Sequence, residues 1–388
     1  VGDIESLPFL EAIRQMAGDV GFDNVLFVHL VLLPYIAAAG ELKSKPAQHS
    51  VKELRSIGLY PNIIVCRSDR EIETSVLEKL SLFCNVPKDN VFSSIDQDSI
   101  YKVPLDFHGQ GFDERVCELL GMWTAKPDLK EMEKVVFNFE NPLREVKIGI
   151  VGKYTELIES YKSLDEALQH AAVANQLKLA PVYIDAEDLE KGDFSSLEKV
   201  DGVLVPGGFG ERGTEGKIKA IQYARENKVP FFGICLGLQL SMIEFARNVV
   251  GIKDATSEEF SSSGSPVIHY MVGQTKEGSK GGSMRLGAYD CDLVKGSYAQ
   301  KIYGKAQISE RHRHRLEVNN AYVDKVKEAG MLISGTNPAL NLVEVIELPD
   351  HPSFIACQYH PEFKSRPYAP HPLFNSFIVK SDEHRREM

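Results

Sequence analysis

The sequence is poor in the features that mark several large classes of protein. Its six cysteines, at 66, 84, 117, 235, 291 and 357, show neither C-x-x-C spacing nor the pairing of a disulfide framework. No apolar run reaches the roughly 18 residues of a membrane span, since the most apolar stretch, 25–39, is shorter and contains His29 and Pro34. Basic residues are outnumbered, with 44 Lys and Arg against 55 Asp and Glu, which disfavours a general nucleic-acid binder. We therefore expect a cytoplasmic protein that binds neither nucleic acid nor a membrane.

Two further signals are missing. The sequence begins Val1-Gly2-Asp3, without an initiator Met and without the charged and apolar regions of a signal peptide. No G-x-x-x-x-G-K-[S/T] run, the loop that cradles nucleotide phosphates, occurs anywhere in it. The sequence therefore resembles the middle of a longer protein.

The 388 residues suggest about two domains. Residues 1–120 alternate strand-like runs (VLFVHLVLL, NIIVCRS) with helical patterns, and charged residues then dominate from Ala125 to Glu145. A second series, with the strand runs KIGIVGKY, GVLVPGG and VPFFGIC, predicts a doubly wound α/β sheet. We expect a first α/β domain at 1–125, a linker at 126–145, a second domain at 146–379 and a charged tail at 380–388.

One cysteine has the setting of a nucleophile. The run VPFFGICLGLQ places Cys235 between a strand and a helix, within a G-x-C-x-G turn. Gly233 and Gly237 allow that turn to be sharp, and a thiol at a helix N-terminus is favoured as the thiolate. A buried structural cysteine is the alternative, because free cysteine is among the most buried residue types.

A base and an oxyanion site are also present. In FIACQYHPEF, a strand delivers His360, and Glu362 follows two residues later, as needed for a base that a carboxylate orients. Backbone amides near Gly207 and Gly208, and the amide of Leu236, are candidates for the oxyanion donors of an acyl transfer. A plain glycine-rich turn and a structural histidine are the competing interpretations.

Together, PGGFG, GICLGLQ and HPEF resemble the motifs of the triad-type (class I) glutamine amidotransferases, in the same order. The resemblance implies that Cys235, His360 and Glu362 hydrolyse the side-chain amide of glutamine through a glutamyl thioester and release ammonia. Arg315 would clamp the α-carboxylate of glutamine and Glu259 its α-ammonium, although both could be surface charges. The implied glutamine contacts are Gly208, Leu236, Gly237, Leu238, Gln239, Glu259 and Arg315.

Other segments narrow the family. The runs TSEEF, GGSMRLGAYDC and ISERHRHRLEVNN, with VGDIESLPFLEAIRQM and KSKPAQHS in the first domain, are similar to the CTP synthase family. We interpret the five residues 311–315 as a charged run immediately before a helix, with a solvated surface as the alternative. The resemblance implies that the first domain is part of a P-loop-type synthetase (amidoligase) domain, followed by a doubly wound class I glutamine amidotransferase domain.

The resemblance also implies nucleotide contacts. Lysines suit a triphosphate because they place point charges on flexible stems, although KSKP is otherwise an ordinary basic loop. The implied contacts with UTP, or with CTP as feedback inhibitor, are Asp3, Ile4, Glu5, Lys43, Ser44, Lys45, Pro46, Ala47, Gln48 and Lys79. The implied contacts with ATP are Ile95, Asp96 and Gln97, and those with GTP as allosteric activator are Phe209 and Arg212.

The implied reaction of the complete protein is ATP-dependent amination of UTP to CTP, with ammonia from glutamine, as the last step of CTP synthesis. It uses ATP and Mg²⁺, whose phosphate loop and acidic metal ligands are absent from these residues, so no metal site is expected here and we expect the glutaminase half alone. Homotetramers built as dimers of dimers are implied, and filaments are left open. The rivals are another class I amidotransferase, a γ-glutamyl hydrolase, and a non-catalytic filament or regulatory protein.

Overall fold

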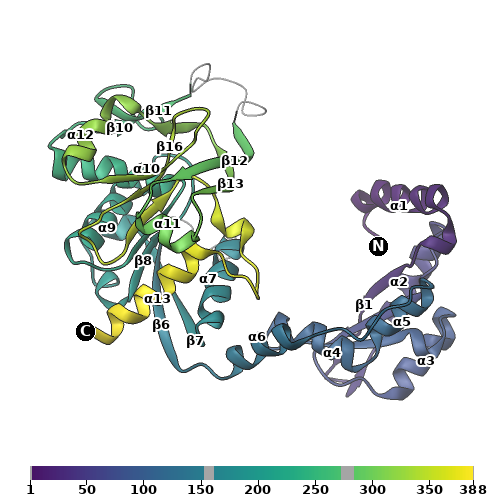
Figure 1. The fold of residues 1–388 in the computed structure, drawn as a ribbon. Helices are drawn as coiled ribbons and strands as arrows, with labels where there is room; N and C mark the ends of the chain where they lie inside the picture. Colours follow the sequence, from purple (N-terminus) through teal and green to yellow (C-terminus); the bar gives the residue numbers. More distant parts are fainter. Residues whose placement is uncertain (1, 153–160, 272–283, 388) are drawn as a thin grey trace. The chain divides into compact units, whose positions relative to one another are not determined.

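The computed structural model describes residues 2–152, 161–271 and 284–387. The chain forms two compact units, Val1–Val136 and Phe137–Met388 (Figure 1). Within the described residues, no helix combines the length and apolar character needed to cross a membrane.

The first unit is built on a three-stranded parallel sheet of order β1-β4-β5. Its central strand is buried on both faces: Ile64 and Cys66 face the core formed with α2 and α3, while Ile63 and Val65 face Phe92 and the side of α4 and α5. Both faces of this parallel sheet are thus covered, as such sheets require. The strands are β1 (Val28–Leu32), β2 (Tyr35–Ile36), β3 (Glu41–Leu42), β4 (Ile63–Ser68) and β5 (Val91–Ile95), and the helices are η1 (Ile4–Ser6), α1 (Leu7–Val20), α2 (Lys45–Ser56), α3 (Thr74–Cys84), α4 (Val103–Gly109) and α5 (Phe112–Leu119).

The boundary between the units falls within a helix. α6 (Lys130–Glu140) occupies the middle of the expected linker at 126–145, and the two units divide between Val136 and Phe137. On the side of the second unit, Asn138 Nδ2 donates to the carbonyl oxygen of Val173 at 3.0 Å. The limits of the domains stay a prediction, and the middle of the expected linker is helical.

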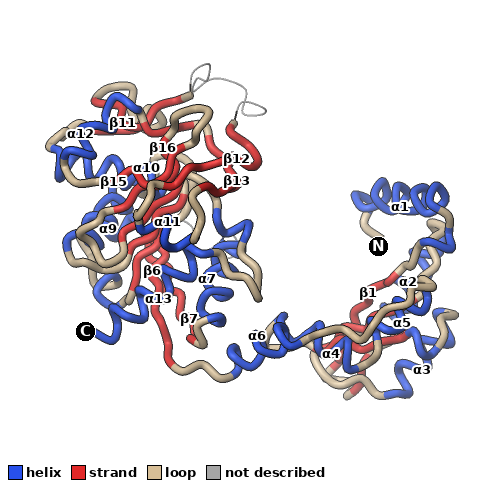
Figure 2. The backbone as a smooth tube through the Cα atoms, viewed as in Figure 1, coloured by secondary structure: helices blue, strands red, loops and turns tan. Residues whose placement is uncertain are grey.

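The second unit is built on a nine-stranded sheet of order β13-β12-β15-β16-β17-β9-β8-β6-β7 (Figure 2). The strands from β7 to β17 run parallel and the remaining neighbours pair antiparallel, with a small separate sheet of order β10-β11-β14. The strands are β6 (Arg144–Gly152), β7 (Leu177–Asp185), β8 (Gly202–Val205), β9 (Phe231–Ile234), β10 (Ala255–Ser257), β11 (Ser265–Tyr270), β12 (Arg285–Leu293), β13 (Gln307–His314), β14 (Leu316–Val318), β15 (Leu332–Thr336), β16 (Val343–Glu347) and β17 (Phe354–Cys357).

Helices cover both faces of this large sheet, which makes the second unit a doubly wound α/β fold (Figure 1). One core joins the sheet to α8, α9, α10 and α12, and the other joins it to α7, α11 and α13. All ten residues of α10 are buried, so this helix passes through the interior. The helices are α7 (Lys162–Ala174), α8 (Ala186–Glu190), α9 (Thr214–Glu226), α10 (Leu236–Phe245), α11 (Tyr298–Tyr303), α12 (Val323–Glu328) and α13 (Pro372–Glu387).

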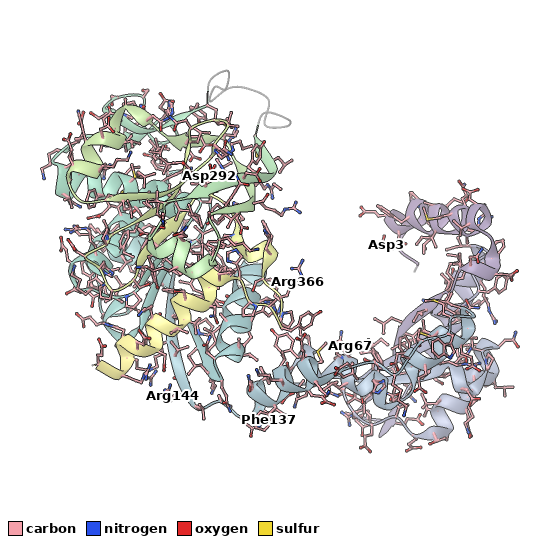
Figure 3. The ribbon with its side chains drawn as sticks, in the orientation of Figure 1. Asp3, Arg67, Phe137, Arg144, Asp292 and Arg366 are labelled. Carbon is pink, nitrogen blue, oxygen red and sulfur yellow. The ribbon has the colours of Figure 1, made fainter. Side chains whose placement is uncertain are left out.

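Two segments differ from the sequence expectations. Residues 311–315 do not form a charged surface run before a helix, because residues 311–314 belong to strand β13 and alternate between solvent and core. The expected tail at 380–388 is helical up to Glu387 as part of α13. The helix continues because Ser381 and Asp382 are buried and Arg144 holds the Asp382 carboxylate through two hydrogen bonds of 2.8 and 3.0 Å. Figure 3 shows Arg144 on β6.

Candidate active site

Cys235 lies on a sharp turn between β9 and α10. Its backbone has φ 52° and ψ −100°, a region that L-residues rarely adopt and that costs free energy. The turn is held because the Cys235 amide donates to the Cys357 carbonyl oxygen at 2.7 Å. A side chain at Gly237 would lie 2.2 Å from the Val205 carbonyl oxygen, and one at Gly233 would lie 2.8 Å from the Ala356 Cβ. The flanking glycines are therefore required by close packing as well as by the turn.

His360 follows the end of β17, the neighbour of β9. Its Nδ1 lies 2.8 Å from Oε1 of Glu362, the second residue of the short helix η9 (Pro361–Lys364). The His360 amide donates to the Arg311 carbonyl oxygen at 2.8 Å, and the Phe363 ring stacks on the imidazole at 5.5 Å between centroids. Parallel pairing of β9 with β17 thus brings a cysteine and a histidine that are 125 positions apart to the same edge of the sheet.

Electrostatics favour a charged His360. Burial acts to lower the pKa of this imidazole, but hydrogen bonds to Cys235 and Glu362 and their charges outweigh it and raise the pKa to about 10. At neutral pH the histidine is therefore an imidazolium, which places a positive charge beside the sulfur of Cys235. A paired histidine of this kind activates a cysteine nucleophile.

A cavity of about 290 Å³ opens above this pair. The loop after β8 forms one wall, and a side chain at Gly207 would lie 2.9 Å from His360 Cε1 and 3.5 Å from Cys235 Cβ. Gly208 lies next to Leu236, since an added side chain would be 3.6 Å from the Leu236 Cδ2. The lining also includes Tyr161, Phe209, Arg313 and Phe363.

Glu259 and Arg315 both act electrostatically on Tyr270. Oε1 of Glu259 accepts from the Gly210 amide at 3.0 Å, in the same loop as Gly208. Burial and then Glu259 raise the pKa of the Tyr270 hydroxyl while Arg315 lowers it, so both charges act on this one ring. An acidic and a basic side chain therefore share Tyr270 as a neighbour within electrostatic range.

Other predicted glutamine contacts lie deeper. Gly237, Leu238 and Gln239 are buried within α10. The Gln239 Nε2 donates to the Leu316 carbonyl oxygen at 3.1 Å and to Oε1 of Gln358 at 3.3 Å. The side chain of Gln239 is therefore engaged inside the protein in this structure.

Two residues near the reaction centre escaped the sequence analysis. The side chain of Gln358 is buried, and its Nε2 lies 3.6 Å from Cys235 Sγ. Arg313 lines the cavity although Arg315 carried the prediction. The signal for Gln358 was its place two residues before His360 in FIACQYHPEF. The signal for Arg313 was the alternation of arginine and histidine along 311–315, which is typical of a strand with the arginines on one face.

The two expected GTP contacts, Phe209 and Arg212, line different cavities. Phe209 lines the cavity above Cys235 and is 46% exposed. Arg212 is paired with Glu187 and lines a different cavity of about 840 Å³, which also borders Thr214 and Arg247.

In the first unit, part of the expected nucleotide site gathers around α2. Lys43 is ion-paired with Glu41, and the Lys43 hydrogen bond and, more weakly, Lys79 lower the pKa of that carboxyl. Lys45 is the exposed first residue of α2, after Ser44, whose hydroxyl accepts from Gln48 Nε2 at 3.1 Å. Pro46 and Ala47 complete this first turn.

The remaining first-unit predictions lie elsewhere in it. Asp3, Ile4 and Glu5 are exposed around η1, where Asp3 accepts from the Glu5 amide at 3.1 Å. Ile95 ends β5, and Asp96 after it pairs with Arg67 Nε at 2.7 Å, while Gln97 is exposed. Asp3 and Arg67 are labelled in Figure 3.

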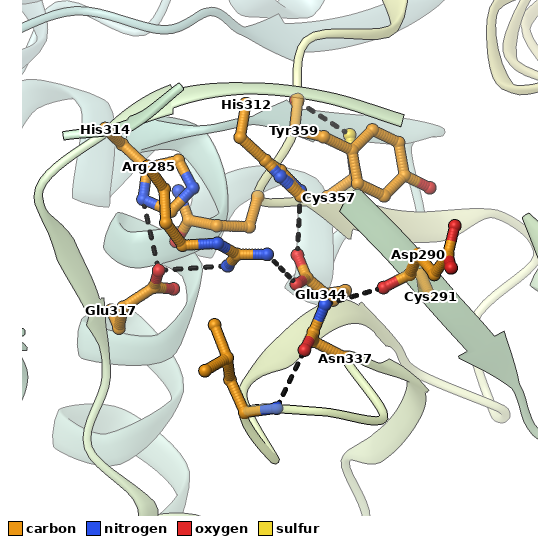
Figure 4. Close-up of polar contacts among 12 residues, drawn as sticks. Arg285, Asp290, Cys291, His312, His314, Glu317, Asn337, Glu344, Cys357 and Tyr359 are labelled. Atoms are coloured by element: carbon orange, nitrogen blue, oxygen red, sulfur yellow. Dashed lines mark hydrogen bonds and ion pairs between the residues drawn. The ribbon is translucent and has the colours of Figure 1, made fainter. Parts of the chain in front are cut away.

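A buried cluster of charged and titratable side chains lies on strands close to β17 (Figure 4). Arg285 on β12 contacts Glu317 at 3.0 Å and Glu344 at 2.5 Å. His312 lies 3.2 Å from the Glu344 carboxylate, and His314 lies 3.5 Å from that of Glu317. All five side chains are at most 2% exposed. The cluster therefore ties β12, β13, β14 and β16 together next to β17, whose following residues include His360.

Burial determines the protonation of this cluster. It raises the pKa of Glu317 to about 8 and that of Glu344 to about 7, against the opposing effect of Arg285. It also lowers the pKa of His312 to about 3, with Arg285 and His360 adding to the effect. The two histidines are therefore neutral, and Arg285 is the main positive charge that compensates the two carboxyls.

Within the described ranges, no group of three or more His, Cys, Asp or Glu side chains is arranged to hold a metal ion. The active-site arrangement itself needs only the thiol, the imidazole and the carboxyl described above. It can carry out acyl transfer, with a nucleophile, a base and neighbouring backbone amides.

Known proteins share both parts of this chain. The family model "Glutamine amidotransferase class-I" matches residues 156–380, and "CTP synthase N-terminus" matches residues 1–122. The CTP synthases of Geobacter metallireducens and Geobacter sulfurreducens are each 55% identical, over 99% and 98% of this chain and 72% and 71% of their own lengths.

A solved structure matches the second unit. It is described as the glutaminase domain of Trypanosoma brucei CTPS with bound acivicin, is 40% identical and has a TM-score of 0.58. The match covers 61% of this chain and 94% of that one. With both family models, relatives along almost its whole length and this structural likeness, the chain belongs to the CTP synthase family of glutamine-hydrolysing ligases.

Proposed function

We propose that the second unit hydrolyses glutamine at Cys235 and supplies the ammonia with which the complete enzyme converts UTP to CTP. The observation that carries the proposal is the hydrogen-bonded set of Cys235, His360 and Glu362 at the edge of a cavity. The use of the ammonia is proposed from the relatives, which are named CTP synthases. Conversion of UTP to CTP requires an amino group, and ammonia from glutamine can supply it.

The chemistry proceeds in two transfers. The thiolate of Cys235 attacks the side-chain amide carbon of glutamine, and the His360 imidazolium gives its proton to the departing nitrogen, which leaves as ammonia. Water then attacks the thioester, with neutral His360 as base, and glutamate is released. The backbone amides of Gly208 and Leu236 are the proposed donors to the oxyanion, and such a donor contributes about 3 kcal/mol.

The α-ammonium and the α-carboxylate of glutamine are each proposed to bind a side chain of opposite charge. We assign the α-ammonium to Glu259 and the α-carboxylate to Arg315, since opposite charges in this pair fit a zwitterion. The electrostatic effect of both charges on the Tyr270 hydroxyl and the hydrogen bond from the Gly210 amide to Glu259 support this assignment. Arg313, which lines the cavity, is a competing clamp for the carboxylate.

The first unit is proposed to hold UTP, or CTP as feedback inhibitor. Lys43 and Lys79 act on the same carboxylate of Glu41, and Lys45 begins a helix whose free amides favour an anion. These features support a triphosphate site around the N-terminus of α2. Asp3, Ile4 and Glu5 are exposed, as contacts to a ligand must be before it binds.

ATP is proposed to meet Ile95, Asp96 and Gln97. These residues directly follow β5, and ligands of parallel α/β sheets bind outside the carboxyl ends of the strands. Mg²⁺ is proposed to accompany ATP in the complete enzyme, but the described residues offer no set of ligands for it, so no step here involves the metal.

The regulation and setting of the enzyme are proposed from its family. Phe209 and Arg212 are the proposed contacts for the activator GTP, and Phe209 lies at the cavity where activation would act. Assembly into homotetramers and a cytoplasmic location complete the proposal. The six free thiols suit a reducing compartment.

Release of ammonia from glutamine tests the proposal directly. We expect wild type to release ammonia and to incorporate one equivalent of a 6-diazo-type glutamine analogue at Cys235, and we expect Cys235→Ala to do neither. GTP should increase the rate of the wild-type chain. Ammonia release that survives in Cys235→Ala would disprove the assignment, as would labelling of another cysteine.

A matched control separates the nucleophile from general thiol effects. Cys291→Ala removes an equally buried thiol from β12, outside the cavity. This variant should keep both ammonia release and labelling. Loss of both in Cys291→Ala and in Cys235→Ala alike would point to a folding defect, and a melting curve for each variant identifies that case.

A further inference from the structure

A chain of two buried amides ends at the nucleophile. Gln239 Nε2 lies 3.1 Å from the Leu316 carbonyl oxygen and 3.3 Å from Gln358 Oε1, and Gln358 Nε2 lies 3.6 Å from Cys235 Sγ. Both amide side chains are nearly inaccessible, Gln239 at 4% and Gln358 at 0% exposed. Solvent therefore cannot replace these hydrogen bonds.

Donor and acceptor roles along this chain follow from its first member. The Leu316 carbonyl can only accept, so the end of Gln239 that faces it must be the NH₂ group. The same NH₂ group faces Gln358, which must therefore present its oxygen. Gln358 is thus forced to turn its own NH₂ group toward Cys235, without any choice between the two amide orientations.

The backbone around Gln358 is also fixed. Its amide donates to the Glu344 carbonyl oxygen at 2.9 Å. On either side, Cys357 pairs with β9 and β16, and His360 is bonded through its amide to Arg311. The Gln358 donor is therefore held in place before any substrate arrives, which is the condition for electrostatic preorganisation.

We propose that Gln358 is a further catalytic residue, whose side-chain N–H donates to the sulfur of Cys235 and stabilises the thiolate, with Gln239 as the positioning residue that orients it. The inference rests on the proposed function, in which the thiolate attacks glutamine. A hydrogen bond to an ion is stronger than one to a neutral group. The donor therefore favours the thiolate over the thiol.

The interaction involves no change in bonding. His360 is hydrogen-bonded to Cys235, and Gln358 supplies a second contact to the sulfur at 3.6 Å. When the sulfur becomes part of the thioester, it loses its charge and the contact weakens. The donor therefore acts on the free enzyme and on the final release of the thiolate, more than on the intermediate.

The test is the rate at which iodoacetamide alkylates Cys235 as a function of pH, in the complete chain. Gln358→Met keeps the length of the side chain and removes the donor, so the midpoint of the pH profile should rise by about one unit, and alkylation at pH values below the midpoint should slow about tenfold. Gln358→Glu places a carboxyl beside the sulfur and should raise the midpoint further. Glutamine hydrolysis should follow the same loss, mainly in kcat.

Gln307→Met is the matched control. Gln307 lies on β13 and donates to Asp292 at 2.7 Å, so the same substitution removes one hydrogen bond on an exposed surface. Its alkylation profile should coincide with that of wild type. If Gln358→Met does not fold, Gln239→Met is used in its place. This substitution removes the partner that orients the Gln358 amide, so the midpoint of the alkylation profile should still rise, but by less than in Gln358→Met.

Two kinds of failure are distinguishable. A Gln358→Met profile identical to that of wild type, with hydrolysis within twofold, would overturn the role of Gln358 and leave the proposed function intact. Alkylation that never reaches Cys235 in wild type, or hydrolysis that persists in Cys235→Ala, would overturn the proposed function itself. A loss of hydrolysis in Gln358→Met without any shift of the alkylation profile would assign the residue a structural role and also overturn the inference.

Discussion

Oε1 of Glu362 lies 2.8 Å from Nδ1 of His360, and both side chains are largely buried. The two residues are separated only by Pro361, which begins the short helix η9 and turns the carboxylate back toward the imidazole. This contact fixes the tautomer of His360, because Nδ1 must carry a proton that faces Glu362. The other ring nitrogen is therefore free to act on Cys235.

Replacement of Glu362 by Gln should weaken catalysis while it preserves the shape of the site. The hydrogen bond and the charge of Glu362 both raise the pKa of His360, so the variant should lose the imidazolium at a lower pH. We expect kcat for glutamine hydrolysis to fall roughly 10²-fold and the alkaline limit of activity to move to lower pH. A pH–rate profile checks both, and an alkaline limit equal to that of wild type would contradict this role.

Gly207→Ala should reduce activity through a single methyl group. That methyl would lie 2.9 Å from His360 Cε1 and 3.5 Å from Cys235 Cβ, closer to the ring than carbon atoms pack. The imidazole must shift, and a misplacement of about 1 Å can cost on the order of 10²-fold in rate. We expect kcat for glutamine hydrolysis to fall about tenfold or more.

Gly192→Ala is not a suitable comparison because Gly192 has φ +93°, which an alanine would strain. Gly109→Ala is suitable, because an added side chain there meets no atom within 4 Å. Its ammonia release should equal that of wild type. A Gly207→Ala variant as active as Gly109→Ala would show that His360 tolerates the displacement.

The sequence allowed the reaction centre to be predicted because its motifs are local. The G-x-C-x-G turn requires its glycines for close packing with Val205 and Ala356, and His360 and Glu362 are two positions apart. Residues 311–315 were misread because their arginines and histidines are all polar. The structure buries His312 and His314 and exposes Arg311 and Arg313, a period of two that is typical of a strand.

The buried cluster around Arg285 could not have been predicted from residues 311–315. His312 pairs with Glu344 and His314 with Glu317, and Arg285 bridges the two carboxyls. Arg285 and Glu344 lie on strands distant in sequence from β13, so only the sheet order brings these residues together. Buried charge of this kind is rare enough that composition favours a solvated surface. The amide contact of Gln358 with Cys235 has the same origin, because it depends on the pairing of β17 with β9.

Arg285→Met should destabilise the second unit strongly. It removes the charge that Glu317 and Glu344 share and leaves two buried carboxyls without their partner. Loss of one partner from a buried ion pair costs about 3–5 kcal/mol in the free energy of unfolding. Calorimetric unfolding measures this loss, and Arg212→Met, which breaks an exposed pair with Glu187, should cost far less stability.

Two further substitutions test the reason for the instability. If Arg285→Met fails because carboxyls are left uncompensated, then adding Glu317→Gln and Glu344→Gln should recover part of the lost stability. If the triple variant is less stable than Arg285→Met, the arginine acts by packing and not by charge.

His351 should make the second unit sensitive to acid. Its Nε2 lies 3.1 Å from the Ala224 carbonyl oxygen, and its Nδ1 accepts from the Ser353 amide at 3.1 Å, so the ring is held as one neutral tautomer. Burial lowers the pKa of this imidazole to about 4, although the bond to Ala224 opposes the shift. The unfolded chain takes up the proton near its usual pKa of about 6.5.

The sign of the effect follows from which state binds the proton. Between about pH 6.5 and 4, the unfolded state is protonated at His351 and the native state is not, so stability falls as the pH is lowered and is fully present above about pH 6.5. A pKa difference of about 2.5 units corresponds to about 3 kcal/mol.

His351→Gln can still donate to Ala224 and accept from Ser353, but it cannot titrate. The stability advantage of wild type over this variant should therefore decrease by about 3 kcal/mol from pH 7 to pH 4. Calorimetric unfolding across this pH range measures the difference, and a constant gap between wild type and His351→Gln would mean that the native ring accepts the proton as readily as the unfolded chain does.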